Sequence, residues 1–226
     1  MKVDLVGKIK NTQLPRSKAL FPMFEAVVNS FQAIEDASES GLSPSIHVVV
    51  NRDSALPGMD GDVDGFTVTD NGVGFNEVNL DAFFTSDTQY KLRRGGKGLG
   101  RFIWLKAFEH AEIESHYRDN GKLLKRSFKF TTNGEQPTAP ATESKETKPK
   151  TTIRLMTMRP RYKENCPRDL AVIGHRLIEH CLPFFLDQKC PAVIISDNND
   201  SKNLNQYFRE NFRGKRSKVQ KVSQLF

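Results

Sequence analysis

The sequence predicts an α/β (α+β) fold in which helices pack on one mixed β-sheet. Three observations support this prediction. An apolar pattern with the helical period lies near the start of the chain, several short β-branched runs follow it, and a second helical pattern lies between the last two of these runs. The succession of helices and strands contains no internal repeat. Such a succession is typical of a layered sandwich with a single sheet.

The first half of the chain opens with a helix predicted over residues 17–39, where apolar residues recur every three or four positions. Gly41 and Pro44 end that pattern. Beyond it we expect strands at 45–52 and 65–70 joined by a turn-rich loop at 53–64, then a short helix at 76–84, a polar glycine-rich loop at 85–98 and a helix at 99–108.

The second half begins with a predicted hairpin, because strands expected at 111–118 and 122–132 flank the pair Asn120 and Gly121. Residues 133–150 are rich in Pro, Thr, Glu and Lys, and this composition predicts a flexible loop. A strand at 151–158, a helix at 169–182 and a strand at 192–197 complete a domain predicted over 1–200, which a basic, helix-like tail over 201–226 follows as the start of a further region.

The composition is that of a folded protein with a core: of 226 residues, 37% are apolar and 27% are charged. The N-terminal residues carry a charge every few positions, and no run approaches the roughly 18 apolar residues that span a bilayer. We therefore expect neither a signal peptide nor a membrane partner. Three cysteines without a CxxC pair argue against a disulfide framework or a structural zinc site, and favour a cytoplasmic location.

The net charge of +7 is unevenly distributed along the sequence. Residues 1–120 carry a net charge of −4 and residues 164–200 one of −3, whereas residues 121–163 carry +8 and residues 201–226 carry +6. The surplus of positive charge in these two late segments has two interpretations: a surface that binds DNA or an acidic partner, or an ordinary solvated surface.

The first motif lies on the helix predicted at 17–39, where Glu25 and Asn29 stand four residues apart and therefore on one face. Their neighbours are apolar, so the pair belongs to the side that should meet the sheet. A solvated polar stripe is one interpretation. The other is a pair that binds a hard cation and activates water, since an amide oxygen can ligate Mg²⁺ and a carboxylate can act as a base.

The second motif is the segment DNGVGF at 70–75, directly after a predicted strand. The Asn-Gly pair alone would indicate a hairpin turn. The second glycine and the strand-end acid favour a ligand site instead. Glycines let the backbone approach a flat ligand, and the carboxylate of Asp70 can accept a hydrogen bond from an amino group.

The third motif, GGKGLGR at 95–101, is a glycine-rich loop that opens directly into a predicted helix. Backbone N–H groups and the positive end of the helix dipole favour an anion there, and Lys97 and Arg101 add charge. The loop is not a Walker A motif, because Gly98 stands where Ser or Thr would follow the lysine, and it is not the dinucleotide GxGxxG motif. A flexible loop without a ligand is the alternative.

The order of these motifs resembles the GHKL superfamily of ATP-binding proteins, which includes DNA gyrase, MutL-type repair proteins, the ninety-kilodalton heat-shock chaperones and sensor histidine kinases. An ExxxN helix, DxGxG after a strand, a glycine loop entering a helix and a strand led by threonine follow one another over residues 15–160. The resemblance implies the Bergerat ATP-binding fold, a two-layer sandwich whose mixed sheet is covered on one face by helices.

The resemblance also implies a role for each matching residue, with ATP and Mg²⁺ as the ligands. Glu25 would be the general base that activates water, Asn29 the Mg²⁺ ligand, and Asp70 the acceptor of the adenine amino hydrogen. The remaining matches are nucleotide contacts: Gln32 and Ala33 beside the pocket, Gly72 and Gly74 in the turn, Lys97, Gly98, Leu99, Gly100 and Arg101 in the lid over the phosphates, and Thr151, with Thr152 as the alternative register, supporting Asp70 through a water.

By the same resemblance we expect an ATPase whose lid closure drives a conformational or dimerisation cycle. Histidine kinases commonly carry asparagine at the position of Glu25, and the five histidines here are scattered, so a histidine-kinase domain is the less favoured alternative. A nucleotide-gated binding module with little hydrolysis is another. Relatives such as gyrase carry a second domain, so the expected partner is either an ATP-dependent homodimer mate or a following domain.

Overall fold

A mixed eight-stranded sheet forms one layer of this computed structural model, which describes residues 5–37, 41–53, 61–84, 100–132 and 139–213. The strands are β1 (Ser45–Arg52), β2 (Val63–Asp70), β3 (Phe108–Asp119), β4 (Lys122–Phe130), β5 (Thr142–Glu143), β6 (Lys150–Met158), β7 (Ala192–Ser196) and β8 (Ser201–Asn203). Across the sheet they follow the order β5-β4-β3-β6-β2-β1-β7-β8. Neighbouring strands are antiparallel except β1 and β7, which are parallel.

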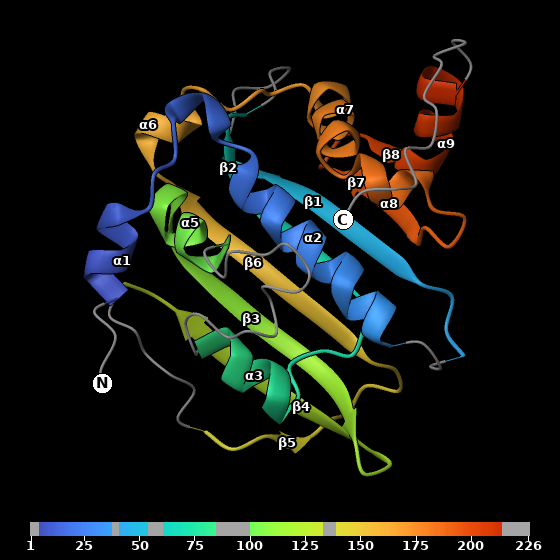
Figure 1. The fold of residues 1–226 in the computed structure, drawn as a ribbon. Coiled ribbons are helices and arrows are strands. Elements are labelled where there is room, and N and C mark those ends of the chain that lie inside the picture. Colours follow the sequence, from blue (N-terminus) through green and yellow to red (C-terminus); the bar gives the residue numbers. More distant parts are fainter. Residues whose placement is uncertain (1–4, 38–40, 54–60, 85–99, 133–138, 214–226) are drawn as a thin grey trace, which may run out of the picture.

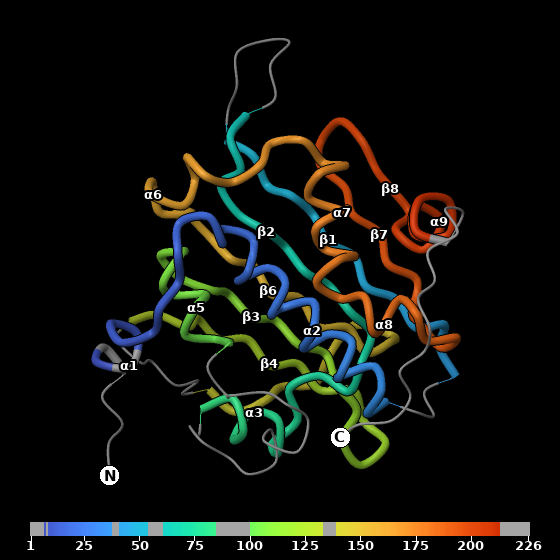
Figure 2. Tube along the Cα trace, turned by 45° about the horizontal axis from the view of Figure 1, so that its top comes forward, coloured from blue at the N-terminus to red at the C-terminus, as the bar shows by residue number. Residues whose placement is uncertain are grey.

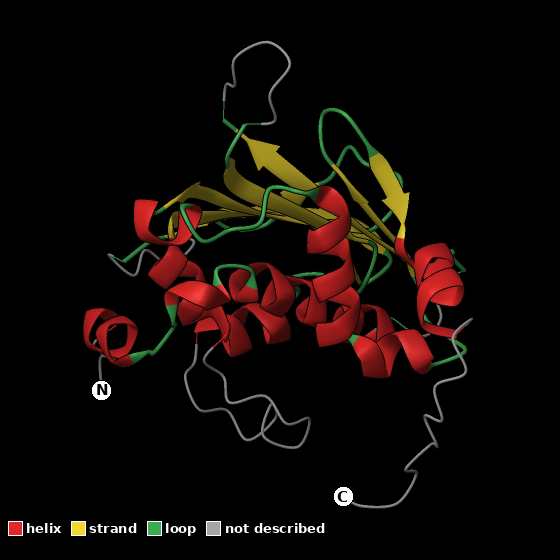
Figure 3. Cartoon of the chain, turned by 90° about the horizontal axis from the view of Figure 1, so that it is seen from above, coloured by secondary structure: helices red, strands yellow, loops and turns green. Residues whose placement is uncertain are grey.

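The helices form the second layer and cover one face of the sheet (Figure 3). They are α1 (Leu5–Asn11), η1 (Arg16–Lys18), α2 (Phe21–Asp36), α3 (Glu77–Phe84), α5 (Gly100–Ala107), α6 (Pro160–Lys163), α7 (Leu170–His180), α8 (Leu182–Leu186), α9 (Leu204–Phe208) and the π-helical turn η2 (Arg209–Arg213). Helix α2 runs across the middle of this layer and contacts α5, β1 and β2 (Figures 1 and 2). The predicted α+β fold with one mixed sheet is confirmed. No helix in the described ranges combines the length and the apolar character that crossing a membrane requires.

The core lies between the two layers and follows the alternation of the strands. In β1, the alternate residues Ile46, Val48 and Val50 are buried, and the residues between them are more exposed. Helix α2 contributes a buried stripe that includes Phe24 and Val27. Burial of a side chain of this size contributes about 1.5–3 kcal/mol. The stripe therefore fixes α2 on the sheet, and with it the positions of the polar residues on this helix.

The hairpin predicted at Asn120 and Gly121 is confirmed. Strands β3 and β4 pair as far as Asp119 and Lys122, and the two turn residues have φ angles of 48° and 80°. Positive φ at both positions is the conformation of a type I′ turn, which Asn-Gly adopts readily. The pair at 71–72 behaves differently: neither residue has a positive φ, and the chain continues from β2 into α3 instead of turning back.

Two segments that composition places outside the fold belong to it in part. Residues 142–143, within the predicted loop 133–150, form β5 beside β4, and Ser144 hydrogen-bonds His116 (Oγ–Nδ1 2.7 Å). Residues 201–213, predicted to begin the basic tail, form β8, α9 and η2, with Leu204 and Phe208 buried in the core. Both short strands depend on a neighbouring strand for their hydrogen bonds, so local periodicity gives no sign of them.

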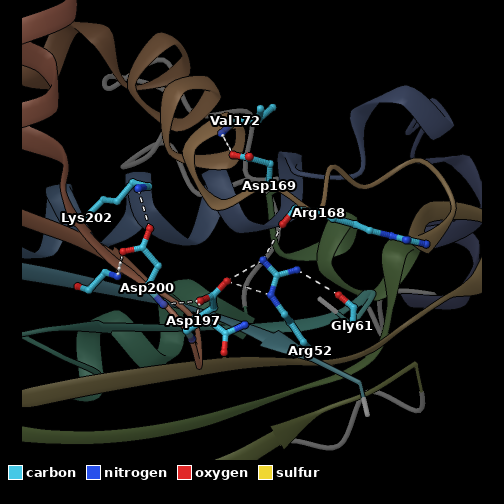
Figure 4. A network of polar contacts seen from close by, with 10 residues as sticks. Arg52, Gly61, Arg168, Asp169, Val172, Asp197, Asp200 and Lys202 are labelled. Carbon is cyan, nitrogen blue, oxygen red and sulfur yellow. Dashed lines mark hydrogen bonds and ion pairs between the residues drawn. The ribbon is translucent and has the colours of Figure 1, made fainter. Parts of the chain in front are cut away.

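A buried ion pair ties the sheet to neighbouring segments at the end of β1 that lies away from Asp70 (Figure 4). Arg52 and Asp197 form the pair (Nη2–Oδ2 2.7 Å), and both side chains are only 4% exposed. The same guanidinium donates to the carbonyl oxygens of Gly61 at 3.1 Å and Arg168 at 2.6 Å. One side chain thus joins β1 to the segment before β2, the segment before α7 and the segment after β7.

Candidate functional site

Asp70 occupies the last position of β2 and is 5% exposed. Its Oδ2 accepts a hydrogen bond from Ser30 Oγ on α2 at 2.7 Å, and its Oδ1 accepts one from the backbone N–H of Gly72 at 2.9 Å. Both oxygens are therefore held, one by the helix layer and one by the turn that follows the strand.

Burial raises the pKa of Asp70 from 3.8 to about 6, and the hydrogen bonds from Ser30 and Gly72 oppose that rise. The carboxylate is therefore the main form at pH 7, although the buried environment disfavours its charge. Because each carboxylate oxygen can accept more than one hydrogen bond, Asp70 can still accept another from a ligand's amino group.

The two glycines of the 70–75 motif are required for different reasons. A Cβ on Gly72 would lie 2.5 Å from the carbonyl carbon of Ala33, and Val73 N donates to the Ala33 carbonyl oxygen at 3.0 Å. Gly74 has a φ of 71°, and a Cβ there would lie 2.6 Å from Ser115 Oγ. The turn is thus held between α2 and β3, and a side chain at either glycine would collide with a neighbour.

Thr151 lies beside Asp70, because the two residues are partners in the β2–β6 ladder. Its hydroxyl contacts Ser115 Oγ at 2.8 Å. Thr152, the next residue, lies on the opposite face of the sheet, where its hydroxyl meets that of Thr69 at 3.3 Å. Of the two registers that the sequence leaves open, only Thr151 shares the helix-covered face with Asp70.

Glu25, Asn29 and Gln32 follow one another at intervals of four and three residues on α2, and each is half-buried. Glu25 lies against the first residue of α5, since a Cβ on Gly100 would come within 2.5 Å of Glu25 Oε2. Glu35, on the same helix, is exposed. Glu25 therefore belongs to the junction of α2 with the start of α5 and not to a fully solvated stripe.

The predicted lid residues fall partly outside the described chain. Lys97, Gly98 and Leu99 lie in the range 85–99, which the structure does not describe. Arg101, in the first turn of α5, is 7% exposed, and its guanidinium lies 4.6 Å from the centroid of the Phe102 ring and 5.6 Å from that of Phe83. The faces of these two aromatic rings therefore interact with the charge of Arg101.

Residues that sequence reasoning missed complete the arrangement around the turn. Asn79 Nδ2 donates to the carbonyl oxygen of Gly74 at 2.7 Å, and Arg126 Nη1 donates to that of Phe75 at 2.7 Å. Arg126 and Ser115 come from β4 and β3, far from the turn in sequence, so no local pattern could have identified them. For Ser30 there was one signal, a polar residue inside an apolar helical run.

Other chemistry-bearing side chains are dispersed. Within the described residues, no three His, Cys, Asp or Glu side chains gather into a group that could hold a metal ion. Cys166, Cys181 and Cys190 are free thiols, and burial raises the pKa of each above its ordinary value. High thiol pKa values disfavour the reactive thiolate, so these cysteines are suited to packing and not to nucleophilic chemistry.

Part of the positive charge of residues 121–163 is neutralised within the chain. Ion pairs with acids outside this segment include Lys125 with Glu114 at 2.7 Å, and Lys163 with Asp53 at 2.9 Å and Asp64 at 2.8 Å. Exposed pairs of this kind contribute about 0–1 kcal/mol each to stability. Their main consequence is that less of the positive charge of residues 121–163 is available to bind an acidic partner.

A separate cavity of about 380 Å³ opens near the N-terminal end of α2. It lies between η1, the start of α2 and α7, and its lining includes Lys18, Phe21, Arg176 and His180. None of the residues that the motifs predict lines it. The cavity and the arrangement around Asp70 are therefore distinct features of the helix layer.

Comparison with models of known protein families finds no match, and a search of curated proteins finds no significant similarity.

Proposed function

We propose that this chain binds ATP together with Mg²⁺ and hydrolyses it, as an ATPase with the Bergerat fold of the GHKL superfamily. The observation that carries the proposal is the convergence of motifs that are distant in sequence. Asp70 is bonded to α2 through Ser30, the glycine turn docks on Ala33, and Glu25 lies against Gly100. Motifs that matched the family order by coincidence would have no reason to meet around one helix.

The adenine would bind at the Asp70 end of this arrangement. A buried carboxylate that is ionised at neutral pH favours a ligand that offers N–H donors. Gly74, with its φ of 71°, lets the turn pack closely on Ser115 beside Asp70, and the resemblance places the adenine next to this turn. Thr151, on the same face of the sheet, is the supporting hydroxyl.

The phosphates would bind toward Glu25 and the start of α5. Mg²⁺ takes oxygen ligands, commonly with one or two from the protein and the rest from phosphates and water, so the half-buried amide of Asn29, one turn from Glu25, fits such a site. When bound, the ion supplies charge neutralisation at the phosphates. Glu25 would orient the attacking water and accept its proton.

The test is the replacement of Glu25 in the full chain. Glu25→Ala should leave ATP binding by calorimetry intact and abolish phosphate release, because it removes the base and not the nucleotide contacts. Glu35→Ala, on the exposed part of the same helix, is the matched control and should retain both. Unchanged turnover in the purified Glu25→Ala variant would overturn the assignment.

The same preparations separate the proposed ATPase from its alternatives. ATP-dependent dimerisation of the wild-type protein without phosphate release would favour a nucleotide-gated binding module. Transfer of phosphate to a histidine of another protein would favour a histidine-kinase domain. A glutamate at position 25 favours hydrolysis over the histidine-kinase alternative, since phosphoryl transfer to a protein histidine has no need of an activated water.

A further inference from the structure

Ser115 joins the glycine turn to the threonine beside Asp70, although it belongs to no sequence motif. It is fully buried on β3, and its Oγ accepts the backbone N–H of Phe75 at 2.9 Å. The same oxygen lies 2.8 Å from Thr151 Oγ1. One hydroxyl group therefore connects two of the elements that surround the proposed adenine site.

By geometry either hydroxyl could be the donor in the Ser115–Thr151 bond, and the N–H of Phe75 favours Ser115, because a hydroxyl that accepts a hydrogen bond becomes a stronger donor. A serine hydroxyl has one hydrogen and two lone pairs, and the N–H of Phe75 already uses one lone pair. The hydrogen of Ser115 needs an acceptor, and Thr151 Oγ1 is the side-chain oxygen that lies within hydrogen-bond distance of Ser115 Oγ among the described residues. With Ser115 as the donor, the hydrogen of Thr151 is free to point away from Ser115.

We propose that Ser115 is a positioning residue that determines base specificity, because it fixes Thr151 as a hydrogen-bond donor. This inference rests on the proposed ATP site. Adenine presents an amino donor beside a ring-nitrogen acceptor, whereas guanine presents a carbonyl acceptor beside a ring N–H donor. Asp70 accepts and Thr151 donates, so a base in direct contact with both groups is complemented if it is adenine and opposed at both positions if it is guanine.

The experiment compares ATP and GTP binding by calorimetry, with Mg²⁺, in the full-length wild-type protein and in Ser115→Ala. We expect the preference for ATP over GTP to fall about tenfold, which corresponds to about 1.4 kcal/mol. Thr152→Ala removes a hydroxyl from the opposite face of the same strand and should keep the wild-type preference. In a Thr151→Ala background, Ser115→Ala should cause no further change, because Ser115 acts through Thr151.

A purely structural role for Ser115 would weaken both nucleotides equally, and that result would overturn the inference. An effect on the preference that persists in the Thr151→Ala background would also overturn it, as would equal affinities for ATP and GTP in the wild type. If Ser115→Ala does not fold, Ser115→Cys keeps a side chain of similar shape with a weak donor, and the same fall in preference is expected. A wild-type protein that binds neither nucleotide would instead overturn the proposed function.

Discussion

Replacement of Asp70 by Asn should stabilise the folded protein at neutral pH while it removes the proposed contact with ATP. The difference between a pKa of about 6 and the ordinary value of 3.8 corresponds to about 3 kcal/mol between the two protonation states. Asparagine has no charge to desolvate, and it can accept from the N–H of Gly72 and donate to Ser30 Oγ in the same space. We therefore expect the free energy of unfolding at pH 7.5 to rise by about 1–3 kcal/mol.

This gain has a definite dependence on pH. The folded protein holds the Asp70 proton more tightly than the unfolded chain does, so the wild type gains stability as the pH falls from above 6 toward 4. At pH 4.5 the advantage of Asp70→Asn should shrink to about a third of its value at pH 7.5. Urea denaturation at both pH values measures it, with Asp119→Asn at an exposed carboxylate as the control. An equal advantage at both pH values, or a less stable variant at pH 7.5, would refute this reasoning.

Three further variants test other parts of the structure. Gly100→Ala would place its Cβ 2.5 Å from Glu25 Oε2, so the displaced carboxylate should lower phosphate release by about tenfold or more with little loss of stability; normal turnover would contradict the contact. Arg52→Met leaves the carboxylate of Asp197 buried without its cation, and should lower the free energy of unfolding by about 3–5 kcal/mol; a loss below 1 kcal/mol would argue against the buried pair. Thr157 is exposed and has a φ of 59°, which disfavours a β-branched residue. Thr157→Asn should therefore raise that free energy by about 0.5–1 kcal/mol in urea titrations, and an unchanged value would show that no strain is stored there.

The parts of the fold that the sequence could predict are those with local causes. Helix α2 shows its own apolar period, and Glu25 and Asn29 are recognisable because their spacing equals one helical turn. The turn at Asn120 and Gly121 is specified by two adjacent residues that tolerate positive φ. Asp70 is visible from the sequence because it ends a strand and precedes two glycines.

The remaining features depend on which strands become neighbours. Ser115 reaches Thr151 only because β3 lies beside β6, and this order is not encoded in either strand alone. The choice between Thr151 and Thr152 is a matter of register, where a shift of one residue moves a side chain to the other face of the sheet. Strand β8 has three residues and is defined by its pairing with β7. Such information is tertiary, so periodicity and composition could not supply it.

The most direct test of the proposed ATP site is calorimetric titration of ATP with Mg²⁺ into the wild type, Asp70→Asn and Asp119→Asn. The wild type and Asp119→Asn should bind ATP saturably at one site, whereas Asp70→Asn should show no saturable binding. Because Asp70→Asn is expected to be the more stable protein at neutral pH, a loss of binding there cannot be attributed to unfolding. A wild-type protein that shows no saturable binding, or an Asp70→Asn variant that binds ATP with wild-type affinity, would contradict the proposed site.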